Sequence, residues 1–265
     1  MREILRAENI TKSYGDKNVL GGISFSIQKG ELVSLLGVSG VGKTTLFNML
    51  SGIGKPDGGT VYLNRALLAE EQEKDDWKVI TGMPGELSYM LQKDLLLPHK
   101  TILDNVSLPL TLKGMKAKDA REKADVYFAR FGLEGTQKKY PAQLSGGMRQ
   151  RAALLRTYLC GNKVVLLDEP FSALDTITKA SMQQWFLEVM SELNLSTIFI
   201  THDIDEAILL SDRIYIMSGE PAVLTNEFTI TRPKPRNQAF TLTDEFLEYK
   251  KQIRTLLFVD QVAFS

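Results

Sequence analysis

Eight consecutive residues, 37–44, have the spacing of a phosphate-binding loop. Their sequence, GVSGVGKT, fits G-x-x-x-x-G-K-[ST] throughout. Its glycines let the backbone N–H groups converge on phosphate oxygens, at the positive end of the helix that follows. Lys43 would neutralise the β- and γ-phosphates, and the Thr44 hydroxyl would bind Mg²⁺. We therefore predict a site for ATP with Mg²⁺, whose nucleotide-binding residues are Gly37, Ser39, Gly40, Val41, Gly42, Lys43, Thr44 and Thr45.

Two adjacent carboxylates could complete the chemistry of this site. In VVLLDEP, Asp168 and Glu169 come directly after the apolar run 164–167. Adjacent side chains point to different sides, so one carboxylate can bind Mg²⁺ while the other faces the attacking water. We assign the metal to Asp168 and the water to Glu169. Alone, such a pair is usually a solvated turn, and the phosphate loop is what favours the functional interpretation.

A parallel sheet is needed to bring these side chains together. The pattern predicts a strand over 31–36 and a helix over 43–50, on either side of the phosphate loop. The nearly continuous apolar runs at 164–167 and 197–201 are typical of strands buried on both faces of a mostly parallel sheet. Apolar side chains at helical spacing over 179–193 indicate a helix packed on the core.

The remaining segments suggest a single domain, 1–265, of the α/β class. Residues 93–161 are rich in helix formers and amphipathic segments, which predicts a helical lobe inserted into the sheet domain. The catalytic core would then comprise 1–92 and 162–220. The tail, 221–265, contains a strand and an amphipathic helix around 244–257, and it is too short for a separate regulatory domain.

Composition limits the possible partners and compartment. Thirty-two basic residues balance 32 acidic ones, so nothing in the charge predicts a nucleic-acid partner. The one cysteine cannot form an intramolecular disulfide, which suits a reducing compartment. The charged N-terminus lacks the apolar core of a signal peptide, and no apolar run approaches the roughly 18 to 20 residues of a membrane span. We expect a cytoplasmic protein whose membrane role comes through a partner.

One further string gives the sequence a family resemblance. Residues 144–151, LSGGMRQR, resemble the signature of ABC ATPases, and the other motifs occur in that family's order. Tyr14 resembles the aromatic residue that stacks on adenine, Gln92 the Q-loop glutamine and His202 the switch histidine. SALD, 172–175, resembles the D-loop. The resemblance implies a RecA-like P-loop core with an N-terminal antiparallel β region and a helical signature subdomain.

The resemblance also implies a mechanism shared between two copies of the chain. A hydroxyl and two side-chain-free residues at a helix start form a second anion site. In the family this signature caps the γ-phosphate held by the other protomer, which gives two composite sites per homodimer. His202 would hold Glu169 or the attacking water, and Gln92 would sense Mg²⁺ and the γ-phosphate. The residues acting in trans would be Ser145, Gly146 and Gly147.

Within the family, the sequence looks most similar to separate importer subunits for nitrate, sulfonate, taurine or thiamine precursors. The implied partners are membrane permease subunits and, indirectly, a solute-binding protein. Residues 95–98, LLLP, would be exposed where the family docks a coupling helix of the permease, unless they merely pack the lobe. The acidic stretch 69–78 and ALLRTYL at 153–159 depart from the family pattern. An exporter or lipid-extraction ATPase, or a soluble ABC ATPase acting on nucleic acid or ribosomes, stays open.

Overall fold

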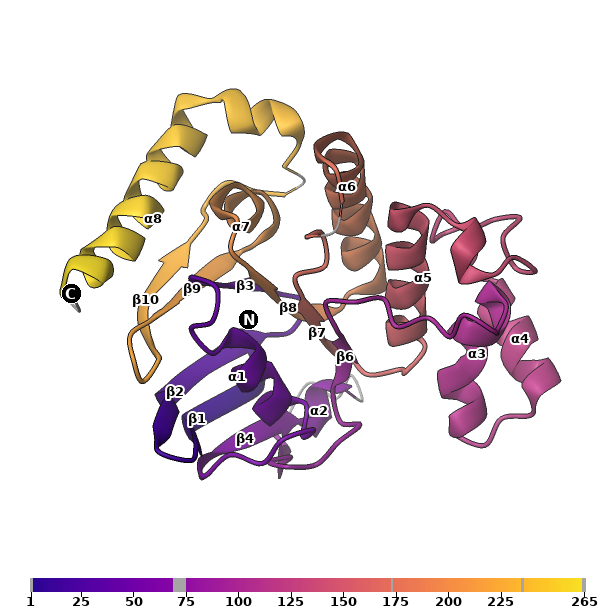
Figure 1. Ribbon diagram of the computed structural model, residues 1–265, viewed down its shortest axis with the longest axis horizontal. Coiled ribbons are helices and arrows are strands. Elements are labelled where there is room, and N and C mark those ends of the chain that lie inside the picture. The colour runs from indigo at the N-terminus through magenta and orange to yellow at the C-terminus, as the bar shows by residue number, and fades with distance from the viewer. Residues whose placement is uncertain (1, 69–74, 173, 235, 264–265) are drawn as a thin grey trace.

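Two sheets form the framework of the computed structural model, which describes residues 2–68, 75–172, 174–234 and 236–263 (Figure 1). In the smaller sheet the strand order is β2-β1-β4-β5, and every pair is antiparallel. This confirms the predicted N-terminal antiparallel region. Its strands are β1 (Glu3–Tyr14), β2 (Lys17–Gln28), β4 (Gly58–Asn64) and β5 (Trp77–Val79).

The larger sheet is mostly parallel, as predicted. Its strand order is β10-β9-β3-β8-β7-β6, and within the described residues only the β9–β10 pair is antiparallel. The carboxyl ends of the parallel strands therefore meet at one edge, where ligand sites of open α/β sheets form. The strands are β3 (Leu32–Leu36), β6 (Ser88–Met90), β7 (Val164–Asp168), β8 (Ser196–Thr201), β9 (Arg213–Ser218) and β10 (Val223–Thr229).

The central strands are buried on both faces because each one serves two hydrophobic clusters. In β7, Val165 and Leu167 pack with the helices of one face. Val164 and Leu166 pack with the opposite cluster, which includes residues of α1 (Lys43–Leu50) and of the N-terminal sheet. This alternation explains why the run is continuously apolar, as expected for a central parallel strand.

Helices cover the large sheet and build a lobe beside it (Figure 1). The lobe contains α3 (Ile102–Leu112), α4 (Ala117–Asp125), a 3₁₀ turn η1 (Pro141–Gln143) and α5 (Gly146–Tyr158). All four lie inside 93–161, which remains the proposed extent of the lobe. The other helices are α2 (Arg65–Leu68), α6 (Thr176–Leu193), α7 (Ile204–Leu210) and α8 (Asp244–Ala263), and Gln238–Leu242 forms the 3₁₀ turn η2. Of the acidic stretch 69–78, residues 69–74 lie outside the described part of the chain.

The tail is attached to the core through a buried arginine. Arg236 is 3% exposed, and its guanidinium donates hydrogen bonds to the carbonyl oxygens of Ile208 (2.8 Å) and Ser211 (2.5 Å). Beyond it, α8 packs against α7. The helix continues to Ala263, past the predicted end at 257.

Candidate active site

The phosphate loop joins the end of β3 to the start of α1, and glycines allow its shape. A Cβ atom on Gly37 would lie 2.5 Å from the carbonyl oxygen of Met217, so only glycine fits there. Gly42 precedes α1 with a φ of 116°. No side chain caps α1 and no acidic residue lies in its first turn. The first backbone N–H groups of α1 can therefore donate hydrogen bonds to an anion bound from solution.

Lys43 is the charged member of this loop. It is 5% exposed, and its Nζ donates to the carbonyl oxygens of Gly37 (2.7 Å) and Val38 (2.8 Å). Burial lowers the pKa of Lys43, while the carboxylates of Glu169 and Asp168 act to raise it. A phosphate entering the loop would add the anionic partner that favours the charged ammonium.

Oxygen atoms suited to a metal converge beside the loop. The Thr44 hydroxyl donates to Oδ2 of Asp168 at 3.0 Å, and the Tyr89 hydroxyl donates to the same oxygen at 3.3 Å. Burial raises the pKa of Asp168, although both hydrogen bonds oppose the shift. A hard cation would compensate this buried carboxylate, so the donor set fits Mg²⁺. Tyr89 was not singled out by the sequence analysis.

Glu169 is the centre of the predicted water chemistry, and each of its oxygens has a partner. Nδ1 of His202 lies 3.2 Å from Oε1, and Nε2 of Gln92 donates to Oε2 at 2.9 Å. Glu169 directly follows β7, His202 directly follows β8, and Gln92 lies two residues after the end of β6. The structure thus brings together three predicted catalytic residues, and it orients the Gln92 amide nitrogen toward Glu169.

The backbone of Glu169 is held in an uncommon conformation. Its φ is 45°, in the left-handed region that non-glycine residues rarely occupy. Its N–H donates to the carbonyl oxygen of Ile200 at 3.2 Å, and its own carbonyl accepts from the Ser172 hydroxyl at 3.0 Å. Retained backbone strain of this kind concentrates at functional sites.

A buried ionic network supports the turn that carries His202. The carboxylate of Glu206, 4% exposed, accepts hydrogen bonds from the Thr201 hydroxyl and from Gln183 (3.1 Å). Nζ of Lys179 lies 2.7 Å from Asp203 and 3.2 Å from Glu206. The lysine therefore links α6 to Asp203, the residue next to His202, and no single motif in the sequence indicates this link.

Replacing Lys179 by methionine should destabilise the protein by about 3 kcal/mol, because it leaves the buried Glu206 carboxylate without its cation. Urea unfolding would measure this. The matched control is Lys118→Met, whose ion pair with Glu122 is mostly exposed and should contribute less than about 1 kcal/mol. Equal losses for the two variants would contradict the inferred role of Lys179.

The signature residues lie in the lobe, away from the phosphate loop of the same chain. The Ser145 hydroxyl caps α5 by accepting from the N–H of Met148 at 3.3 Å. Figure 1 shows α5 separated from α1 by strands β6 to β8. Packing also favours a glycine at position 147, because a Cβ atom on Gly147 would lie 3.2 Å from Cγ2 of Thr178 at the start of α6.

Tyr14 ends β1 at the tip of the β1–β2 hairpin. Its side chain is 54% exposed, and Nζ of Lys12 lies 5.4 Å from the centre of its ring. An aromatic face near solvent can stack on a planar base. The remaining predicted nucleotide contacts, Ser39, Gly40, Val41 and Thr45, lie in the loop and in the first turn of α1.

The predicted docking segment is only partly exposed. Leu95 is 52% exposed, but Leu96 is 7% exposed because it packs into the hydrophobic cluster of the lobe. The expectation that Leu96 lies at the surface was therefore wrong. A groove of about 340 Å³ does run past the segment, lined in part by Leu95, Leu97, Leu108, Pro109 and Leu112.

Comparison with known proteins decides the family. The family pattern described as "ABC transporter" matches residues 20–172. The chain belongs to the ABC transporter family. It is 39% identical over 263 residues to the formylaminopyrimidine import ATP-binding protein ThiZ of Halalkalibacterium halodurans, covering 97% of both chains. It is 34% identical to the nitrate import ATP-binding protein NrtD of a Synechocystis species, covering 92% of this chain and 89% of the relative.

Solved ABC structures have the same fold. An ATP-binding cassette determined as a dimer in a post-hydrolysis state, bound to ADP and phosphate, is 28% identical with a TM-score of 0.68. That match covers 87% of this chain and all of the other. In the part of the chain that the structure describes, no helix has the length and apolar character needed to cross a membrane.

Proposed function

We propose that this ABC ATPase subunit powers import of a small solute across a membrane, and that two copies hydrolyse ATP at two composite sites. The observation that carries the ATPase half is the contact of Glu169 with both His202 and Gln92, beside the Thr44–Asp168 pair. The import half is supported by relatives named as import ATP-binding proteins. Those names do not favour the exporter or the soluble nucleic-acid alternatives.

Each residue near the γ-phosphate has a distinct proposed task. Lys43 and the loop N–H groups bind phosphate oxygens, and Tyr14 stacks on adenine. Bound Mg²⁺, held by Thr44 and Asp168 with the amide oxygen of Gln92, would neutralise charge on the phosphates. Glu169 orients the attacking water and accepts its proton, while His202 fixes the carboxylate from the other side.

Removing the hydroxyl ligand should impair catalysis. We expect Thr44→Val to lower kcat by about tenfold or more, because the metal loses one of its hard oxygen donors. The assay is steady-state phosphate release across a Mg²⁺ titration, and EDTA should abolish the activity of the unchanged protein. Thr111→Val, at an exposed site on α3, is the matched control. Unaltered Mg²⁺ dependence in Thr44→Val would exclude the hydroxyl from the metal site.

The transport role requires a membrane partner. We propose that the groove beside Leu95 and Leu97 receives a short helix of the permease, which would hold the subunit at the inner face of the membrane. Affinity purification from gently solubilised membranes should recover a protein with several membrane helices. Leu112→Asp, at a 78%-exposed position in the groove, should reduce that recovery without altering ATP binding. Recovery of ribosomes or nucleic acid instead would favour the soluble alternative.

The solute itself is a separate question. Relatives named for import of a formylaminopyrimidine, of nitrate and of sulfate or thiosulfate differ widely in solute chemistry, although each of them is similar to this chain. We therefore propose that the solute is selected by the permease and a solute-binding protein.

A further inference from the structure

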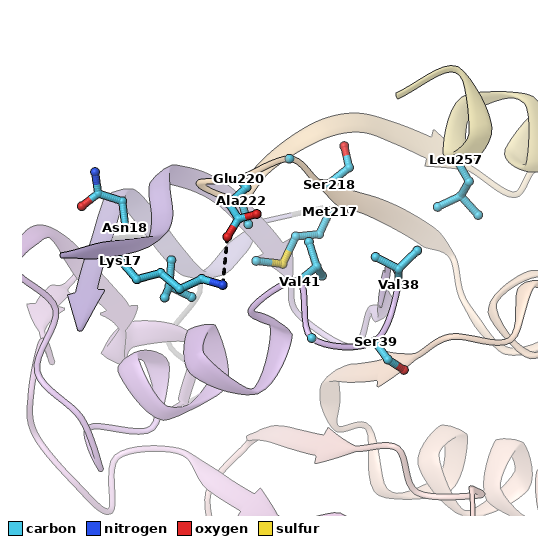
Figure 2. Close-up of a pocket in the computed structure, with 13 residues that line it drawn as sticks. Lys17, Asn18, Val38, Ser39, Val41, Met217, Ser218, Glu220, Ala222 and Leu257 are labelled. Carbon is cyan, nitrogen blue, oxygen red and sulfur yellow. Dashed lines mark ion pairs between the residues drawn. The ribbon is translucent and has the colours of Figure 1, made fainter. Parts of the chain in front are cut away.

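The C-terminal helix reaches the phosphate loop. A cavity of about 370 Å³ adjoins the loop, within the size range of ligand pockets. Figure 2 shows Leu257 pointing from α8 toward the phosphate loop at one side of this cavity. The other walls come from the start of β2, the phosphate loop and the turn between β9 and β10. The apolar lining residues are Val19, Val38, Val41, Met217, Ala222 and Leu257.

Several contacts fix the position of α8. Nζ of Lys250 lies 2.6 Å from Oδ1 of Asp205 on α7, and Ile253 on the same helix is fully buried. Tyr249 contributes its hydroxyl, 2.7 Å from that of Thr231. Leu257 lies one helical turn beyond Ile253 and packs against the same cluster. Leu257 is therefore held at the edge of the cavity because α8 packs against the protein core.

The chemistry of the lining indicates which part of a nucleotide would occupy the cavity. Phosphates are already bound by the N–H groups of the loop and by Lys43. The cavity wall instead combines the six apolar side chains with neutral polar ones and with the Lys17–Glu220 ion pair, whose charges are 2.8 Å apart and already compensate each other (Figure 2). An uncharged ribose or base is the part of ATP that gains from such a wall. The cavity also begins beside Tyr14, which pairs with Lys17 across the β1–β2 hairpin.

We propose that α8 forms one wall of the nucleoside end of the ATP site, with Leu257 contacting the ribose or base. The inference rests on the proposed ATPase function and extends it to the tail, which no motif of the chain connects with nucleotide. The tail would thus contribute to affinity for nucleosides while leaving phosphate binding to the loop.

The test compares two ligands that differ only in the nucleoside. Leu257→Ala should weaken ATP binding by about fivefold, the effect of losing one apolar side-chain contact. Binding of inorganic tripolyphosphate, which has no nucleoside, should not change. Calorimetric titration of the full chain would measure both. The control is Leu247→Ala, since Leu247 lies on the same helix but is 49% exposed, and Leu257→Met should retain the affinity of the unchanged protein.

Each other outcome has a defined meaning. Unchanged or tighter ATP binding by Leu257→Ala, with an unaltered thermal unfolding midpoint, would remove α8 from the site. Equal weakening of both ligands would indicate a general disturbance of the loop and would equally overturn the proposal. Failure of the proposed ATPase function would look different, since the unchanged protein would then release no phosphate from ATP, or Lys43→Ala would bind ATP and tripolyphosphate as well as the unchanged protein does.

Discussion

The Glu169→Gln variant should hydrolyse ATP at least about a hundredfold more slowly than the unchanged protein, because an amide cannot accept the proton of the attacking water. Binding should persist, since the phosphate loop and Lys43 are untouched. The amide also preserves the shape of the side chain between His202 and Gln92. The variant should therefore accumulate in its ATP-bound state as a dimer of 29.7 kDa chains.

Phosphate release and light scattering together test this prediction. Glu188→Gln is the matched control, because Glu188 is an exposed carboxylate on α6 that accepts a hydrogen bond from Gln184, one helical turn away. It should leave turnover unaltered. Normal turnover in Glu169→Gln would exclude the carboxylate from the chemistry, and a monomer at saturating ATP would contradict the two-copy mechanism.

The part of the site that the sequence predicted is the part encoded locally. The phosphate loop needs glycines at fixed positions, and the Asp168–Glu169 pair needs only a strand that ends at the right edge. Continuous apolar runs identified two of the parallel strands, whose carboxyl ends necessarily share that edge. The contact of Glu169 with His202 could be expected only from the family resemblance. Its contact with Gln92 was not predicted, because the resemblance assigned Gln92 to Mg²⁺ and the γ-phosphate.

What the sequence did not predict depends on packing between distant segments. The burial of Leu96 is decided by the lobe cluster and not by its neighbours in LLLP. The left-handed backbone of Glu169 is held in part by the carbonyl oxygen of Ile200 in β8, far from Glu169 in the sequence. The link from Lys179 to Glu206 joins two helices, and Leu257 meets the phosphate loop from the far end of the chain. No local pattern of residue types predicts contacts between segments that lie far apart in the sequence.

A mixture of two inactive variants should recover activity if each site is built from two chains. Lys43→Ala removes the phosphate-binding lysine, and Ser145→Arg blocks the signature that would serve the partner's nucleotide. Each homodimer then has two damaged sites. In a heterodimer, both lesions fall in one site and the other site is intact, so random pairing should restore up to about a quarter of normal turnover.

The matched control for this experiment mixes Lys43→Ala with Glu169→Gln. Both residues belong to the core side of the same site, beside the same phosphate loop, so every heterodimer keeps one lesion in each site and no activity should return. Steady-state phosphate release after mixing the chains in the presence of ATP distinguishes the two cases. Recovery in both mixtures, or in neither, would be incompatible with a signature that acts across the dimer. Recovery in the first mixture alone follows only if Ser145 to Gly147 complete the partner's site, because α5 lies beyond the sheet from the phosphate loop of its own chain (Figure 1).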